Sequence, residues 1–209
     1  MSMRPDVLRW KFWLWMVPIW VALSGPSRAQ VAEIGLFAGG YQLGNKNIGG
    51  LPIDRFGNTV DVGLDSGWLF GFGLTVNNYR FFGHEFGYAY NRTTMKFAEG
   101  AAGEAGTAVH RGFYNFLIYA MPEGAPVRLF VTGGGHFHNY AWPGLSAVSG
   151  GGSTKFGLNY GGGIKFRVSH MFGIRFDYRE YRNGKPFDLL NQEGWIRHRQ
   201  FTAGLSLLL

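Results

Sequence analysis

Five charged side chains stand at alternate positions among small residues, in segments whose other alternate positions are large and apolar. They are Glu85, Lys165, Arg175, Asp177 and Arg179. In an extended chain, residues two apart point to the same side, so Arg175, Asp177 and Arg179 would share one face. Charges removed from water are costly unless they are paired. The pattern therefore favours a structural network of ion pairs. An ion-conducting path is the functional alternative for the same residues.

Two histidines have the spacing of a possible metal site. His136 and His138 lie two residues apart and would share a strand face, where a third ligand could complete a site. No carboxylate accompanies them within that strand, and the chain has no cysteine, which excludes thiolate metal sites and disulfides. We predict no metal and no cofactor.

Two further motifs fail the requirements of catalysis or phosphate binding. Ser169-His170 falls in a short turn with no oriented acid nearby, so a Ser-His-acid triad is not supported. The run Gly150-Gly151-Gly152-Ser153-Thr154-Lys155 lacks the Gly-Lys-Ser/Thr order of a phosphate loop and leads into a strand rather than a helix. We predict no catalytic residue and no enzymatic activity.

The composition calls for a folded domain. Of 209 residues, 46% are hydrophobic, 17% aromatic and only 16% charged, and 34 are glycine. This profile excludes an intrinsically disordered chain, and the glycines follow no three-residue period, which excludes collagen. The length suits one domain.

The N-terminal segment has the features of a secretory signal. Three of its first eleven residues are basic, Phe12 to Leu23 is uncharged, and Ser27 and Ala29 supply the small residues of a cleavage site. We predict a signal peptide over 1–29, with cleavage before Gln30, and a barrel domain over 30–209; an uncleaved anchor is the alternative. Removing 1–29 takes away four of 20 basic and one of 13 acidic residues, which leaves about +4. These charges are scattered, so we predict no nucleic-acid partner.

From Gln30 onward, large apolar residues alternate with small or polar ones, which is the periodicity of β-strands. In the clearest case Trp68, Phe70, Phe72 and Leu74 alternate with Leu69, Gly71 and Gly73. For three segments, the first, fourth and fifth, bulk on both sides leaves the facing open. The pattern predicts eight strands, at 33–42, 67–77, 84–94, 109–120, 127–138, 156–167, 172–181 and 197–209.

The connections between these segments alternate strictly between long and short. The short ones read as turns, such as 78–83, 121–126 and 168–171, and the long ones are Gly-rich loops. This is typical of an all-β, eight-stranded antiparallel up-and-down transmembrane β-barrel, in which one rim carries tight turns and the other long loops.

The two strand faces differ in character, and this decides the environment. Glycine and charges of both signs would make a poor solvent surface but suit the lining of a narrow barrel. The broad apolar face would then contact lipid. We predict that the lipid-facing residues are Trp68, Phe70, Phe72, Leu74, Phe86, Tyr88, Phe172, Ile174, Phe176, Leu205 and Leu207. A soluble barrel carrying an apolar ligand would have the opposite facing.

Several aromatic residues fall at or just beyond the ends of the expected strands, where interfacial girdles of membrane barrels lie. They are Trp68, Tyr79, Phe81, Phe82, Tyr140, Trp142, Tyr181 and Trp195.

In pattern, length and topology the chain beyond residue 29 resembles the small outer-membrane barrels related to the OmpA transmembrane domain. The resemblance implies a porin-like monomer in the outer membrane of a Gram-negative-type bacterium, with outer-membrane lipid as its surroundings and a lumen plugged by the ionic network. The closing segment, His198 to Leu209, resembles the C-terminal signal read by the barrel-assembly machinery, with Leu209 where the family usually has an aromatic residue.

The expected role is structural, or an interaction through the surface loops. Some barrels of this size are enzymes, such as lipid A deacylases, which use a His-x-Ser pair near the outer rim. The comparable stretch here, Arg175 to Asn183, has neither a His nor a Ser. A lipid-modifying barrel enzyme and a soluble periplasmic ligand-binding barrel are the alternatives.

Overall fold

A computed structural model describes residues 31–44, 46–98, 104–144 and 152–209. The predicted signal peptide and its cleavage site before Gln30 lie outside the described residues. Within them no helix is long and apolar enough to cross a membrane. The described chain forms ten strands, which are β1 (Val31–Leu43), β2 (Asn47–Pro52), β3 (Thr59–Leu64), β4 (Gly67–Tyr79), β5 (Phe82–Phe97), β6 (Glu104–Tyr119), β7 (Val127–Ala141), β8 (Gly152–Arg167), β9 (Phe172–Gly184) and β10 (Trp195–Leu208).

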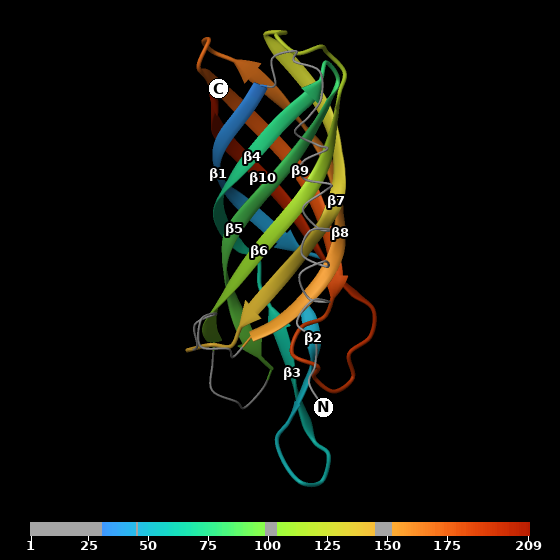
Figure 1. Cartoon of the computed structure of the whole chain (residues 1–209). Coiled ribbons are helices and arrows are strands. Elements are labelled where there is room, and N and C mark those ends of the chain that lie inside the picture. The colour runs from blue at the N-terminus through green and yellow to red at the C-terminus, as the bar shows by residue number, and fades with distance from the viewer. Residues whose placement is uncertain (1–30, 45, 99–103, 145–151) are drawn as a thin grey trace, which may run out of the picture. The chain divides into compact units, whose positions relative to one another are not determined.

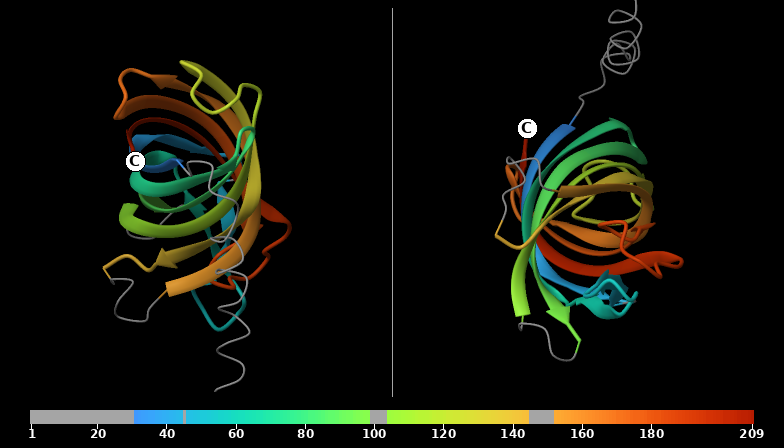
Figure 2. Two further views of the ribbon diagram at one scale, coloured as in Figure 1. Left: turned by 45° about the horizontal axis from the view of Figure 1, so that its top comes forward. Right: turned by 90° about the horizontal axis from the view of Figure 1, so that it is seen from below.

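Eight of these strands close into an antiparallel barrel. Each of β4 to β10 pairs with its neighbour in sequence, β4 also pairs with β1, and β1 pairs with β10 to close the cylinder. Figures 1 and 2 show the tilted strands and the closed wall. The prediction of an eight-stranded up-and-down barrel is confirmed. Closure satisfies the backbone hydrogen bonds of every barrel strand from both sides.

The strands extend further toward the long-loop rim than the sequence indicates. β6 begins at Glu104 instead of residue 109, and β8 begins at Gly152 instead of 156. The loop expected over 95–108 therefore shortens to 98–103. Small polar and glycine residues at these strand starts weaken the apolar alternation, but they still pair, since Lys96 is opposite Glu104 and Ala141 opposite Gly152.

The longest connection contains a β-hairpin that the sequence analysis did not predict. β2 and β3 pair with each other, and β3 continues the sheet beside β5 for three residues. The hairpin extends beyond the wall at the rim opposite the C-terminus (Figure 1). At its tip Gly57 adopts a φ of 88°, and Asp54 accepts hydrogen bonds from the backbone N–H groups of Phe56 and Asn58. This turn chemistry fixes the hairpin tip.

Apolar residues of the hairpin and of the adjoining ends of the barrel strands form the main buried core. It lies at the long-loop end and joins the β2–β3 hairpin to the barrel wall. Its buried members are Tyr41, Leu43, Ile48, Val62, Leu64, Leu69, Met95, Val109, Tyr140 and Ile196. Burial of these side chains holds the hairpin against the barrel, because moving the hairpin away would expose apolar surface to water.

Inward aromatic rings pack over glycines of the neighbouring strand. A side chain at Gly87 would collide with the ring of Phe113, one at Gly71 with Phe37, and one at Gly163 with Phe130. These contacts explain why the first, fourth and fifth predicted segments carry bulk on both faces: the inward rings occupy space that glycine leaves open.

Candidate functional site

The barrel interior holds a network of four charged side chains from β5 and β9. Glu85 accepts hydrogen bonds from Arg175 Nη1 at 2.7 Å and from Arg179 Nη2 at 2.6 Å. Asp177 accepts two from Arg175, both at 2.7 Å, and two from Arg179, from Nη2 at 3.0 Å and from Nε at 3.3 Å. All four side chains are at least nine-tenths buried. Their alternate positions place the three β9 residues on one face, and Glu85 reaches them across the interior.

A second ion pair lies nearer the short-turn end. Lys165 Nζ donates to Glu33 Oε2 at 2.7 Å and to the Tyr119 hydroxyl at 3.0 Å, and Asn77 donates to Glu33 Oε1 at 2.9 Å. Lys165 is therefore inside the barrel, as its spacing indicates, but its partner is Glu33 and not one of the four-residue network. Sequence reasoning missed Glu33 because the facing of the first strand was left open. The alternation of Glu33, Gly35 and Phe37 with exposed Ile34 and Leu36 is the signal that identifies it.

Arg128 lies at the short-turn end of the interior. Its Nη1 donates to Glu123 at 2.5 Å, and its guanidinium carbon lies 3.5 Å from the centre of the Tyr119 ring. Glu123 belongs to the turn between β6 and β7, so the pair fastens a turn to the inside of the wall. Two cavities of only about 30 Å³ each border these charged groups, one beside Glu85 and one beside Glu33.

A third polar cluster lies between the ionic network and the long-loop end. The rings of His136 and His138 are 4.7 Å apart, as are those of His138 and His198, and the Arg111 guanidinium lies 4.0 Å from the centre of the Tyr181 ring. All five side chains are buried. Arg111 was not singled out from the sequence because its strand carries bulk on both faces.

Hydrogen bonds hold part of this cluster. Asn183 Oδ1 accepts from His138 Nδ1 at 2.8 Å, and the Asn183 amide donates to the Tyr140 hydroxyl at 3.0 Å, which in turn contacts His198 Nε2 at 3.0 Å. His136 and His138 share a face, as predicted. Among the residues that the structure describes, no group of three or more His, Cys, Asp or Glu side chains is arranged to hold a metal ion.

The Ser169-His170 pair lies in the turn between β8 and β9. Ser169 Oγ accepts hydrogen bonds from the backbone N–H groups of Met171 and Phe172, at 3.3 and 3.0 Å. The hydroxyl therefore caps its own turn. Of the Gly-rich run, residues 152–155 are part of β8, and residues 150 and 151 lie outside the described residues.

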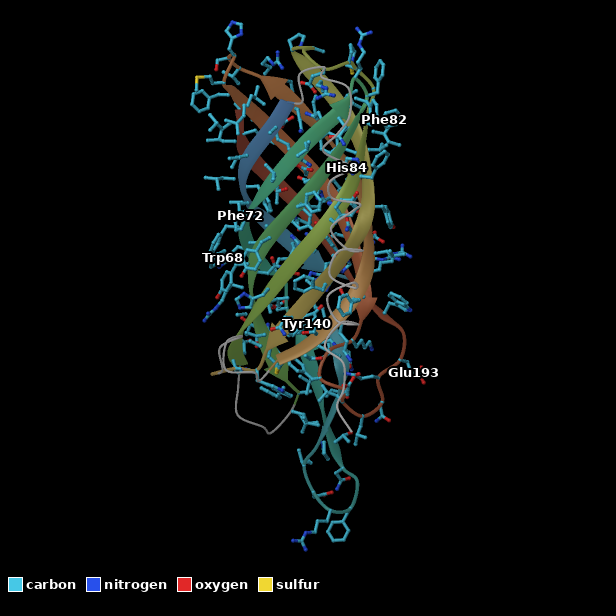
Figure 3. The ribbon with its side chains drawn as sticks, in the orientation of Figure 1. Trp68, Phe72, Phe82, His84, Tyr140 and Glu193 are labelled. Carbon is cyan, nitrogen blue, oxygen red and sulfur yellow. The ribbon has the colours of Figure 1, made fainter. Side chains whose placement is uncertain are left out.

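The exterior of the barrel carries the broad apolar side chains. Trp68, Phe70 and Phe72 are each more than half exposed, and Figure 3 shows Trp68 and Phe72 along the outside of the wall. Leu74, Phe86, Phe172, Phe176 and Leu205 are also exposed on this side, and Tyr88, Ile174 and Leu207 are half-buried there against neighbouring side chains.

Two aromatic residues expected in an interfacial girdle point inward instead. Tyr140 and Tyr181 are fully buried and belong to the interior polar cluster, so their assignment to the girdle is wrong. Both lie on the same face of their strands as His138 and Arg179, and that parity determines their direction. Trp142 is partly buried and stacks on Phe187, 4.2 Å between ring centres. The other residues predicted for the girdle are exposed, namely Trp68, Tyr79, Phe81, Phe82 and Trp195.

Comparisons with known proteins identify the fold. No family model and no curated protein sequence matches the chain. Among solved structures, the outer membrane protein OprG from Pseudomonas aeruginosa matches with a TM-score of 0.61 and 13% identity, over 88% of this chain and 98% of that one. Neisserial surface protein A matches with a TM-score of 0.54 and 13% identity, over 84% and 96%. Ail, the attachment invasion locus protein of Yersinia pestis, in complex with the heparin analogue sucrose octasulfate, matches with 0.51 and 12%, over 87% and 100%. The chain thus shares the fold of small eight-stranded outer-membrane β-barrels.

Proposed function

We propose that this chain is an outer-membrane β-barrel with a structural or surface-interaction role and a lumen closed by its ionic network. One observation carries the proposal: the closed cylinder has apolar rings on its outside and paired charges on its inside. Exposed aromatic and aliphatic side chains cover the wall from β4 to β10, far more than the isolated apolar residues of a water-soluble surface. Hydrocarbon is the solvent that suits such a wall, and a closed barrel leaves no edge unpaired in it.

The soluble-carrier alternative requires the opposite facing. A barrel that binds an apolar ligand in water would direct Trp68, Phe70 and Phe72 toward its axis, and here all three are exposed on the outside. The interior offers charged and polar walls and cavities of about 30 Å³, which is room for one or two water molecules. This argues against an enclosed apolar ligand and supports a closed lumen.

The long-loop end provides the surface for an interaction. The hairpin tip exposes Ile53 and Phe56, the latter to 92%. Hydrogen bonds from Lys46 at 2.6 Å and from Lys96 at 3.0 Å anchor Asp65 at the hairpin base and hold the pKa of its carboxyl well below its usual value. Ail, a barrel of the same fold, carries the name attachment invasion locus protein, which favours a contact role for the loop end here. We infer that the tip of the hairpin contacts a partner outside the membrane.

The location can be tested in cells that express the chain. We expect it in the outer-membrane fraction, and we expect its migration on a denaturing gel to change on heating, because the closed barrel resists detergent until heated. Recovery in the soluble periplasmic fraction would contradict the proposal.

The orientation can be tested by labelling, because the chain has no cysteine of its own. A single cysteine at the hairpin tip, Phe56→Cys, should react in intact cells with a maleimide that does not cross membranes. The matched control His170→Cys lies in an exposed turn at the opposite end and should react only after the outer membrane is permeabilised. The reverse pattern would show that the long loops face the periplasm.

Two partners belong to the same proposal. We propose that the barrel is a monomer surrounded by outer-membrane lipid, since its strands pair within one chain, and that the barrel-assembly machinery inserts it by reading β10. The outward residues Phe201, Leu205 and Leu207 of that strand alternate with inward Thr202 and Ser206.

A further inference from the structure

Four charged and one phenolic side chain form a cluster on the outer wall of β8, β9 and β10. Glu180 lies at its centre, and Tyr160, Arg182, Arg197 and Arg199 surround it. These residues occupy outward positions of their strands, on the same side as exposed Phe156, Leu158 and Phe201. Charge on this otherwise apolar wall needs an explanation, because charged side chains facing lipid are costly except near the membrane surface.

Glu180 organises the cluster. Its Oε1 accepts hydrogen bonds from the Tyr160 hydroxyl at 2.6 Å and from Arg182 Nε at 2.7 Å, and the Nε of Arg197 lies 3.2 Å away. Its Oε2 is 4.0 Å from Arg199 Nε. Glu180 itself is buried by these neighbours, while each arginine side chain stays between 41% and 46% exposed. Glu180 thus holds Arg182 and Arg197 by close contacts and lies near Arg199, and all three guanidinium groups remain partly exposed.

The cluster carries an excess of positive charge. One carboxylate faces three guanidinium groups, and each guanidinium has five N–H donors. Arg182 and Arg197 are directly opposite each other in the β9–β10 register. Like charges at opposed positions of a sheet destabilise it. Glu180 Oε1 contacts both arginines and offsets part of this repulsion. A second anion would neutralise the charge that one carboxylate leaves uncompensated and accept from the guanidinium donors that Glu180 and Tyr160 do not use.

The height of the cluster on the barrel indicates where that anion lies. Arg182 stands two residues before the end of β9, and Arg197 two residues after the start of β10, beside exposed Trp195. This is the long-loop rim, where Trp belongs at the boundary between hydrocarbon and headgroups. A lipid places its phosphate at that level.

We propose that Arg182, Arg197 and Arg199 bind the phosphate of an anionic lipid headgroup in the leaflet at the long-loop end. Guanidinium groups suit this ligand because they form paired hydrogen bonds with phosphate oxygens. The inference rests on the proposed membrane location and adds a lipid-binding site on the outer wall, separate from the loop contact.

The test uses the purified full chain in detergent, titrated with bisphosphorylated lipid A and followed by native mass spectrometry. We expect the chain to bind this lipid at least tenfold more tightly than the same lipid with its phosphates removed. Each arginine near a charged headgroup contributes about fivefold to the affinity, and the negative charge of Glu180 cancels part of the combined effect. The variant Arg182→Gln/Arg197→Gln/Arg199→Gln should lose this preference. The control Arg55→Gln/Arg80→Gln/Arg167→Gln removes the same charge elsewhere and should keep it.

Three outcomes would overturn the inference. One is equal binding of the phosphorylated and dephosphorylated lipid by the unmodified chain. This comparison does not depend on whether the triple variant folds. Another is loss of preference in both triple variants. The third is displacement of lipid A by an equal concentration of inorganic phosphate, which would assign the site to a free anion. Fractionation and heat-dependent migration of the same preparation report separately on the barrel proposal, so its failure is distinguishable.

Discussion

Glu85→Gln tests the reasoning about the barrel interior. The substitution keeps the size and shape of the side chain and removes a carboxylate that contacts both Arg175 and Arg179 from across the barrel. Asp177 then remains as the single anion beside two buried guanidinium groups. The change leaves uncompensated positive charge in a region where Glu85 is 4% exposed.

The expected loss of unfolding free energy is about 3–5 kcal/mol, the usual range when one partner of a buried ion pair is removed. The acceptor of two hydrogen bonds from arginine, of 2.7 and 2.6 Å, becomes neutral. A hydrogen bond to a charged group contributes about 1.5–3 kcal/mol to stability, so the loss of two agrees with that range. The fold should persist, because Gln can still accept one of these bonds and the strand pairing is unchanged.

The assay is urea unfolding of the barrel in lipid vesicles, followed by tryptophan fluorescence. Glu193→Gln is the control, since Glu193 is exposed in the loop before β10 (Figure 3), and it should change stability by no more than about 0.5 kcal/mol. Adding Arg179→Gln to Glu85→Gln should recover part of the loss, because the excess cation is removed. A Glu85→Gln loss below about 1 kcal/mol would refute the view that buried ion pairs stabilise this lumen.

Three other measurements address separate features. A barrel closed by its ionic network should give no steady conductance in a planar bilayer, and a stable open channel would contradict the closed lumen. Gly161→Ala should cost about 1–3 kcal/mol because its Cβ would lie 2.1 Å from a backbone oxygen of the next strand, whereas Gly35→Ala, with 3.6 Å to its nearest neighbour, should be tolerated; equal stability of the two would be contrary evidence. The lowered pKa of Asp65 means that its stabilisation of the hairpin is complete above about pH 4 and is lost as the pH falls below that value toward the folded pKa. The protection factors of the amides of residues 47–64, which are exchange rates corrected for the intrinsic rate at each pH, should therefore fall in acid. Asp65→Asn should abolish this dependence; a fall in protection that persists in the variant would exclude Asp65 as its cause.

Alternation of side chains was sufficient to predict the barrel. Period-two segments near Trp68 and Phe172 carry a strong apolar face, and their positions agree with β4 and β9. The β2–β3 hairpin was missed because Asn47–Pro52 and Thr59–Leu64 are short and contain glycine, proline and aspartate, which weaken the strand pattern. Their pairing depends on burial of Ile48 and Val62 against the long-loop end of the barrel, a tertiary contact that local sequence does not encode.

The sequence predicts the interior residues of those strands in which large apolar and small or charged residues clearly alternate. Glu85 and the three β9 residues followed from clean alternation, whereas Glu33 and Arg111 lie on strands with large residues on both faces. On those strands the inward face is recognised from a glycine on the neighbouring strand. Gly87 has no side chain, and this leaves space in the interior for the ring of Phe113. Pairing of a ring with a distant glycine depends on strand register, which the sequence of one segment does not give.

The seam between β1 and β10 has a consequence for how the protein reaches its final form. Its register joins Glu33 to Leu208 and Leu43 to His198, so it brings together the first and the last strand of the barrel. Every other hydrogen-bonded pair of barrel strands lies much nearer in sequence, and contacts of long sequence separation form slowly. Until β1 and β10 pair, the sheet is open and each of them leaves an unpaired edge. The backbone N–H and C=O groups of such an edge can pair with a strand of a second molecule. The speed of this last step therefore sets how long the nascent sheet is exposed to aggregation.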